Sequence, residues 1–284
     1  MINGNRAYQI PEKKLSAADV ASGYRILAGL YEHIPPMIIW RAWEYAAYQG
    51  YTLAEPVLDL GCGDGRFFKL LWPGISDVIG IDADPFVVQR AKESGLYKEV
   101  HLCSADKLPL QPASFSTVFA NCSLEHMNNI GAVIGEVSRC LCPNGSFVLS
   151  VVTNYWSEMD VLSELISMSG SPEIANSLHS RYIEYHNLVN PFSLEEWIGM
   201  LESAGFGITE YCSIVPKMTG KFFMFLDHLW HLRTGKDEFG SVLYSELKGI
   251  NNFSEQFCAV LNSMLGMEDN SNVHLGVVIR AVRQ

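Results

Sequence analysis

The sequence predicts an α/β protein built on a seven-stranded, mostly parallel sheet with helices on both faces. Two observations carry this prediction. Short apolar runs alternate with helical segments along the chain, which is typical of a parallel sheet with crossover helices. The first of these runs, Val57-Leu58-Asp59-Leu60, leads directly into the glycine-rich turn Gly61-Cys62-Gly63-Asp64-Gly65. An apolar run of this kind indicates a strand covered on both faces.

The other elements follow from local signals. Asp84-Pro85 combines an N-cap with proline at the first helical position, and Ser193-x-x-Glu196 is a capping box. These signals predict helices from 85 to Gly95 and from 194 to Ala204, with a further helix over 130–141. We expect strands at 57–60, 78–82, 99–103, 115–121, 146–152, 208–215 and 273–282.

We expect one domain over residues 1–284. Residues 1–50 form an N-terminal helical cap that is broken at Pro35-Pro36, and residues 51–152 form the ligand-binding core. Two stretches do not fit a minimal sheet, namely 153–192 and 216–272. Their helical, apolar character predicts insertions that form a lid, a substrate region or a dimer interface.

Composition excludes several classes of partner. The net charge is −11 and the pI is near 5.2, so no basic footprint favours nucleic acid or an anionic membrane. Seven scattered cysteines indicate reduced thiols and a cytoplasmic protein. Cys140-x-Cys142 is too tight for a metal knuckle, so we expect no metal site. The N-terminus lacks a signal peptide, and no run of 18 apolar residues predicts a transmembrane segment.

The glycine turn indicates the charge of its ligand. Its spacing is G-x-G-x-G, whereas the dinucleotide-binding turn needs G-x-G-x-x-G. Asp59 precedes the turn and Asp64 lies inside it. Carboxylates at these places repel a pyrophosphate and suit a cationic ligand. The stretch resembles the first motif, D/E-x-G-x-G-x-G, of class I S-adenosylmethionine (SAM)-dependent methyltransferases, which have a three-layer, Rossmann-like sheet.

Three more segments extend this resemblance. Asp82 ends the second strand, where a carboxylate can accept ribose hydroxyls. Ser104-Ala105-Asp106-Lys107 resembles the family segment that faces adenine. Leu124-Glu125-His126 resembles the "L-E-H" segment of small-molecule methyltransferases, and 139–145 resembles their R-x-L-x-P-G-G turn, with Asn144 for a glycine. The resemblance thus implies these cofactor-binding residues: Tyr31, Asp59, Gly61, Gly63, Asp64, Gly65, Asp82, Ala83, Ala105, Asp106, Lys107 and Asn121.

Tyr31 belongs to that set because such enzymes often place an N-terminal helix over the cofactor, in which case Tyr24 would also face the pocket. The alternative is that the first helices only pack against the sheet. We expect SAM as cofactor and S-adenosylhomocysteine as product.

The acceptor is expected to be a small or lipid-linked molecule, methylated at oxygen in preference to nitrogen or carbon. The chain lacks the N/D-P-P-Y/F box that is typical of enzymes methylating base amines. His126 and His186 are candidate general bases, although each could instead be a structural hydrogen-bonding residue. A non-methylating SAM-binding protein and a protein methyltransferase remain as alternatives, as does a homodimer.

Overall fold

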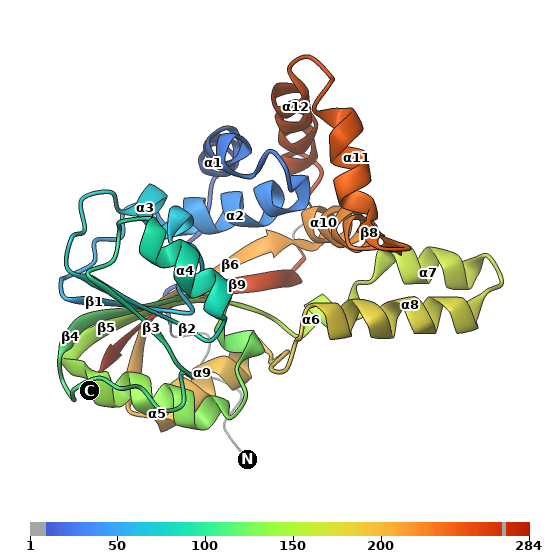
Figure 1. Ribbon diagram of the computed structural model, residues 1–284. Helices are drawn as coiled ribbons and strands as arrows, with labels where there is room; N and C mark the ends of the chain where they lie inside the picture. The colour runs from blue at the N-terminus through green and yellow to red at the C-terminus, as the bar shows by residue number, and fades with distance from the viewer. Residues whose placement is uncertain (1–9, 269–270) are drawn as a thin grey trace.

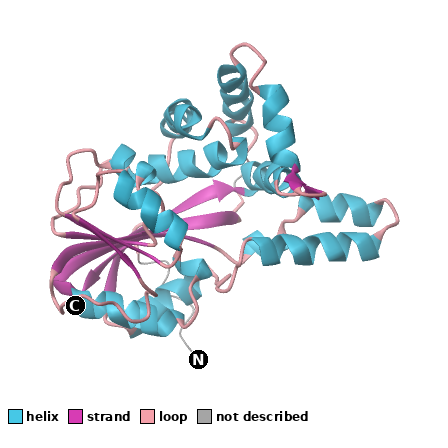
Figure 2. Ribbon diagram, viewed as in Figure 1, coloured by secondary structure: helices cyan, strands magenta, loops and turns pink. Residues whose placement is uncertain are grey.

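The computed structural model describes residues 10–268 and 271–284, so a few residues of the expected cap and of the second insertion lie outside the described residues. A seven-stranded sheet with the order β3-β2-β1-β4-β5-β9-β6 runs through the molecule (Figures 1 and 2). Its strands are β1 (Val57–Leu60), β2 (Val78–Asp82), β3 (Glu99–Leu102), β4 (Phe115–Asn121), β5 (Leu141–Val152), β6 (Phe206–Pro216) and β9 (His274–Arg283).

The expected sheet is confirmed. Strands β1 to β5 pair in parallel, and β9 inserts antiparallel between β5 and β6. The largest boundary difference is at β5, which begins at Leu141 rather than at 146, whereas β3, β6 and β9 differ by only one or two residues. Leu141 pairs with Phe115 before the Pro143-Asn144-Gly145 turn, and the register shifts across that turn. Asn144 adopts the left-handed conformation, with φ of +62°, which its short polar side chain tolerates.

Side chains alternate between the two faces of the sheet, and helices cover both faces (Figure 1). Val57 and Val278 face the core shared with α1 (Ala17–Tyr31), α2 (Pro35–Tyr48), α10 (Lys217–Trp230) and α12 (Phe253–Leu265). Leu58 and Ile279 face the opposite core, which α5 (Ile130–Cys140) and α9 (Leu194–Ser203) cover. Helix α3 (Arg66–Leu71) follows the glycine turn, and α4 (Pro85–Glu93) links β2 to β3.

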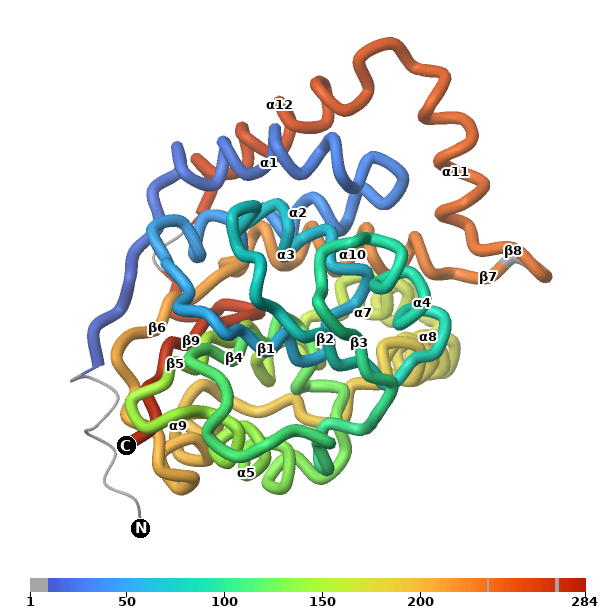
Figure 3. The backbone as a smooth tube through the Cα atoms, turned by 60° about the vertical axis from the view of Figure 1, so that its left-hand side comes forward, coloured from blue at the N-terminus to red at the C-terminus, as the bar shows by residue number. Residues whose placement is uncertain are grey.

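The N-terminal cap consists of α1 and α2. Ser16 and Asp19 form a capping box at the start of α1, and proline occupies the first positions of α2. Helix α12 lies alongside α1 (Figure 3), and the Cys258 thiol is 3.4 Å from the Tyr24 carbonyl oxygen. Segments from the two ends of the chain therefore form one layer above the sheet.

A buried carboxylate joins this cap to the sheet. The Glu44 side chain on α2 has no exposed surface. One of its oxygens accepts a 2.6 Å hydrogen bond from Ser150 at the end of β5. The other accepts bonds from Arg41 at 2.6 Å and Asn121 at 3.2 Å. Helix α2 is thus fixed to the carboxyl ends of β4 and β5.

The two insertions are mainly helical, as expected. Residues 153–192 contain α6 (Tyr155–Glu158), α7 (Val161–Met168) and α8 (Pro172–Tyr185), and α7 and α8 project as a hairpin (Figure 1). The second insertion adds α11 (Phe239–Leu247) to α10 and α12. It also contains a two-stranded hairpin, β7 (Arg233–Thr234) and β8 (Asp237–Glu238), which the helical pattern did not predict. Among the described residues, no helix is long and apolar enough to cross a membrane.

Candidate cofactor-binding site

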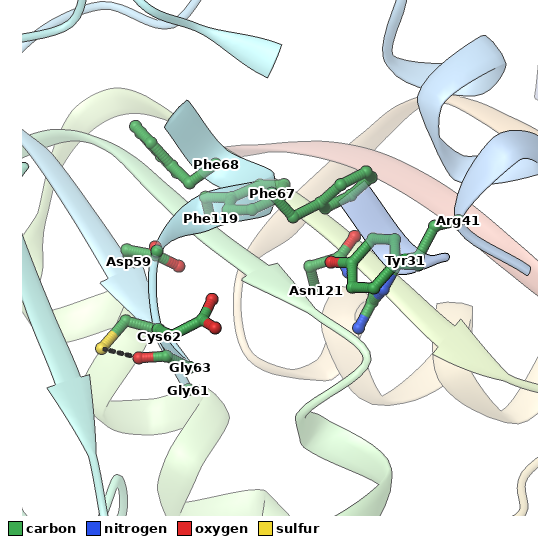
Figure 4. Close-up of a pocket in the computed structure, with 12 residues that line it drawn as sticks. Tyr31, Arg41, Asp59, Gly61, Cys62, Gly63, Phe67, Phe68, Phe119 and Asn121 are labelled. Carbon is green, nitrogen blue, oxygen red and sulfur yellow. Dashed lines mark hydrogen bonds between the residues drawn. The ribbon is translucent and has the colours of Figure 1, made fainter. Parts of the chain in front are cut away.

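A pocket with a cavity of about 100 Å³ lies at the carboxyl ends of β1 and β4 (Figure 4). The glycine turn forms one side of it, and the cap helices contribute the other. Its lining consists of Tyr31, Arg41, Asp59, Gly61, Cys62, Gly63, Asp64, Gly65, Phe67, Phe68, Phe119 and Asn121.

All three glycines of the turn have positive φ, at +74° for Gly61, +56° for Gly63 and +76° for Gly65. A Cβ atom on Gly61 would lie 2.4 Å from the Ser123 Cβ, and one on Gly65 would lie 2.8 Å from the Tyr97 ring. A Cβ on Gly63 would meet no atom within 4 Å. Packing therefore requires the outer two glycines, whereas the middle one borders open space that a ligand can occupy.

Asp82 supports the turn from the neighbouring strand. One of its oxygens accepts the Gly63 backbone N–H at 3.1 Å, and the other accepts the Asp84 N–H at 3.0 Å. The carboxylate is thus held at the end of β2, beside the turn, with remaining lone pairs for a further donor.

Asp59 is a buried acid without a cationic partner among the described residues. Its side chain accepts a 2.6 Å hydrogen bond from the Tyr97 hydroxyl. Burial raises the pKa of Asp59 to about 7, and the nearby Asp82 charge adds to this effect, although the Tyr97 hydrogen bond opposes it. Asp64 differs, because Arg66 at 2.7 Å and Arg90 at 3.1 Å already pair with its carboxylate.

The opposite wall is held by the Glu44 network. Asn121 ends β4 and accepts a 2.8 Å hydrogen bond from the Tyr48 hydroxyl, while its amide donates to Glu44. Arg41 forms an ion pair with Glu44 and lies over the Phe67 ring, 5.1 Å from the ring centroid. Figure 4 shows Tyr31, Arg41 and Asn121 together, across from Asp59 and the glycine turn.

The structure brings most of the predicted cofactor residues together. Seven line the pocket: Tyr31, Asp59, Gly61, Gly63, Asp64, Gly65 and Asn121. Asp82 contacts the turn from outside the lining, and Ala83, Ala105, Asp106 and Lys107 are not part of the lining. The placement of Tyr24 in the pocket is wrong, because its side chain is 1% exposed and packs in the core.

The two candidate bases lie close to one another but outside the pocket lining. The His126 Nδ1 is 3.3 Å from the carbonyl oxygen of Asn187, the residue after His186. Burial lowers the pKa of His126, so its imidazole is neutral near pH 7. The His186 Nε2 lies 2.9 Å from the Asp227 carboxylate.

Sequence reasoning missed part of the site. Arg41, Cys62, Phe67, Phe68 and Phe119 also line the pocket. The signal for Arg41 was its spacing three residues before Glu44 in an otherwise apolar helix, which is the spacing of an ion pair. Glu125 was also missed: its side chain is fully buried, and neither carboxyl oxygen has a hydrogen-bond partner among the described residues.

Comparisons with known proteins identify the class. Two solved structures share the fold. One is a SAM-dependent methyltransferase of Thermotoga maritima, with a TM-score of 0.53 and 15% identity; the match covers 92% of this chain and 98% of that one. The other is from the complex between the Trm112 methyltransferase activator of Haloferax volcanii and a methyltransferase, with a TM-score of 0.51 and 18% identity; the match covers 94% of this chain and 96% of that one. The family model described as "Methyltransferase domain" matches residues 58–149. Residues 58–149 are therefore similar to a methyltransferase domain, and the sheet has the Rossmann-like fold of solved methyltransferases.

Curated relatives agree with this class. An uncharacterized methyltransferase of Schizosaccharomyces pombe is 30% identical over 183 residues, which cover 58% of this chain and 64% of the relative. The malonyl-[acyl-carrier protein] O-methyltransferase of Legionella pneumophila is 33% identical over 102 residues, or 34% and 36% of the two chains. The ubiquinone biosynthesis O-methyltransferase of Xanthomonas euvesicatoria is 28% identical over 160 residues, or 55% and 65%. The matches thus span between about a third and two thirds of these relatives.

The buried Glu125 carboxyl makes stability depend on pH. Burial raises its pKa to about 8 from the ordinary 4.5, so on raising the pH the unfolded chain loses this proton first. The free energy of unfolding should then fall between about pH 4.5 and 8, on the order of 4 kcal/mol from this group. Denaturant unfolding of Glu125→Gln should show a higher stability than the parent at pH 8 and no such gain at pH 4.5. An equal difference at both pH values would contradict the shifted pKa.

Proposed function

We propose that the protein transfers the methyl group of SAM to an oxygen atom of a small or lipid-linked acceptor. The observation that carries this proposal is the pocket at the carboxyl edge of the sheet, where the open space at Gly63 adjoins the buried acid Asp59. A parallel sheet binds its ligands at this edge.

The charges of the pocket suit SAM. Asp59 is desolvated and has no cationic partner among the described residues, so a ligand with an ammonium group and a sulfonium would favour its ionised form. A pyrophosphate would instead meet the carboxyl groups of Asp59 and Asp82. The cavity of about 100 Å³ is small for a whole nucleoside ligand, which typically needs roughly 300 Å³ or more. We place the amino acid part in the cavity and the nucleoside along the ends of β2 and β3, past Asp82, Ala83 and Asp106.

The reaction itself demands positioning more than acid–base chemistry. SAM supplies a charged leaving group, so an acceptor oxygen about 3 Å from the methyl carbon and in line with the sulfur is the main requirement. A hydroxyl acceptor must also lose its proton. We assign this role to His126, because its lowered pKa leaves it neutral and able to accept a proton near pH 7.

Two observations support the acceptor class. The ubiquinone biosynthesis and malonyl-[acyl-carrier protein] relatives are named as O-methyltransferases. In addition, both insertions lie at the carboxyl edge of the sheet and could enclose a small acceptor (Figure 1). The seven free cysteines support a cytoplasmic location.

A non-methylating SAM-binding protein would share the pocket but show no turnover. A protein methyltransferase is the second alternative, and labelling of a polypeptide in place of a small acceptor would favour it.

The direct test is methyl transfer from SAM carrying a labelled methyl group to a panel of phenols, carboxylic acids, quinols and amines. We expect a labelled product from a hydroxyl or carboxyl acceptor. His126→Asn should lower kcat by about 10²–10⁴-fold while the SAM dissociation constant stays unchanged. Labelling of amines alone would contradict oxygen transfer, and SAM binding without any product would favour the non-methylating alternative.

Asp82→Ala tests the cofactor contact. Losing the charged acceptor should weaken SAM binding by about 1–3 kcal/mol, or roughly 5- to 150-fold. Asp77→Ala is the matched control, because Asp77 precedes the same strand at its far end and only pairs with Lys98 at 2.8 Å on the surface. Equal affinities of both variants, measured by calorimetry, would remove Asp82 from the site.

A further inference from the structure

Three side chains from the two insertions converge away from the cofactor pocket. His186 ends α8, Asp227 lies on the last turn of α10, and His231 follows that helix. One ligand atom from each lies within 4.8 Å of the other two. The His186 Nε2 is 2.9 Å from one Asp227 oxygen, and the His231 Nε2 is 3.6 Å from the other. Asp227 is only 3% exposed.

The orientation of His186 is not that of a hydrogen bond. Its Nε2 atom is buried and has no partner of acceptable geometry, although an Asp227 oxygen is 2.9 Å away. A short nitrogen–oxygen separation without hydrogen-bond geometry is typical of two ligands of one cation, because both atoms are directed at the cation and not at each other. Two ligand atoms that each lie about 2.0–2.1 Å from a tetrahedral ion are roughly 3.4 Å from one another. The two nitrogen–oxygen separations in this cluster, 2.9 and 3.6 Å, lie on either side of that distance.

A neighbouring carboxylate provides the contrast. Asp160 also lies between two histidines, with His228 Nδ1 at 2.8 Å and His179 Nδ1 at 3.0 Å. Ser163 donates its backbone N–H and its hydroxyl to the same carboxylate. These contacts have hydrogen-bond geometry, so this cluster is satisfied without an ion. In the Asp227 cluster, by contrast, the His186 Nε2 has no hydrogen-bond partner among the described residues.

One outer contact orients a member of the Asp227 cluster, because the Tyr182 hydroxyl donates to Asp227 at 2.7 Å. The Nδ1 of His231 is buried without a hydrogen-bond partner among the described residues, and the Glu238 carboxylate lies 3.7 Å from it, beyond hydrogen-bond distance. One member of the cluster, His231, lies on the wall of a cavity of about 300 Å³, whose lining also includes Tyr182, Tyr185, Glu184, Arg181 and Arg233.

We propose that His186, Asp227 and His231 bind a divalent cation of the zinc class and so fasten helix α8 to helix α10. Two imidazole nitrogens and one carboxylate oxygen suit Zn²⁺ or a similar transition metal, whereas Mg²⁺ and Ca²⁺ prefer oxygen ligands alone. The sequence predicted no metal because its cysteines lack a knuckle spacing; these ligands are dispersed over both insertions instead. A cation here also occupies His186, which leaves His126 as the proton acceptor.

The test is the zinc content of tag-free protein that has been equilibrated with Zn²⁺ and then dialysed against metal-free buffer. We expect one zinc per chain by mass spectrometry, and near zero for His231→Ala. His179→Ala is the matched control, since it removes a histidine from the satisfied Asp160 cluster, and should retain the ion. Tyr182→Phe should weaken Zn²⁺ binding by about 10- to 100-fold.

Hydrogen exchange supplies an independent readout. Removing zinc with a chelator should raise amide exchange in 172–185 and 217–230 of the parent and leave exchange in His231→Ala unchanged. No retained zinc, or equal zinc in the parent and His231→Ala, would overturn the proposal. SAM affinity is measured in the same samples and should not change, so failure of the metal site is distinguishable from failure of the methyltransferase assignment.

Discussion

The arrangement of the site depends on one buried ion pair. Glu44 and Arg41 lie on the same helix, and Glu44 also accepts hydrogen bonds from residues that end β4 and β5. A buried carboxylate is costly unless its lone pairs are satisfied, so this network fixes α2 in a single position over the carboxyl edge of the sheet. Arg41 and Asn121, two of its members, line the pocket. The same contacts thus anchor the cap and shape the site.

The glycine-turn side of the pocket holds acidic groups that no cation in the described part of the chain neutralises at Asp59. The glycine turn brings Asp59 and Asp82 close together, and burial raises the pKa of Asp59 to about 7. The free protein therefore holds an acid whose ionisation is unfavourable until a cation arrives. A Rossmann-like fold alone is compatible with many ligands. The buried acid Asp59 is the feature that favours a cofactor with a sulfonium group. The proposed proton acceptor, His126, lies in the segment after β4 and not on the glycine turn.

The sequence predicted the fold and the cofactor side of the pocket because both depend on local signals. Strand periodicity, the glycine spacing and the capping residues at Asp84 and Ser193 all act within a few residues. It could not predict contacts that join distant segments. Glu44 meets Ser150 across 106 positions, and His186 meets Asp227 only because the two insertions fold against each other. Tyr24 was misplaced for the same reason, since α12 covers it.

The central claim is that the acidic glycine turn binds SAM. Calorimetric titration of the purified protein with SAM, S-adenosylhomocysteine and NAD in parallel tests it most directly. The account predicts micromolar binding of the first two and none of NAD, because the carboxylates around the turn repel a pyrophosphate. Binding of NAD without binding of SAM would contradict the account. The assignment of the pocket residues to SAM binding would then be wrong.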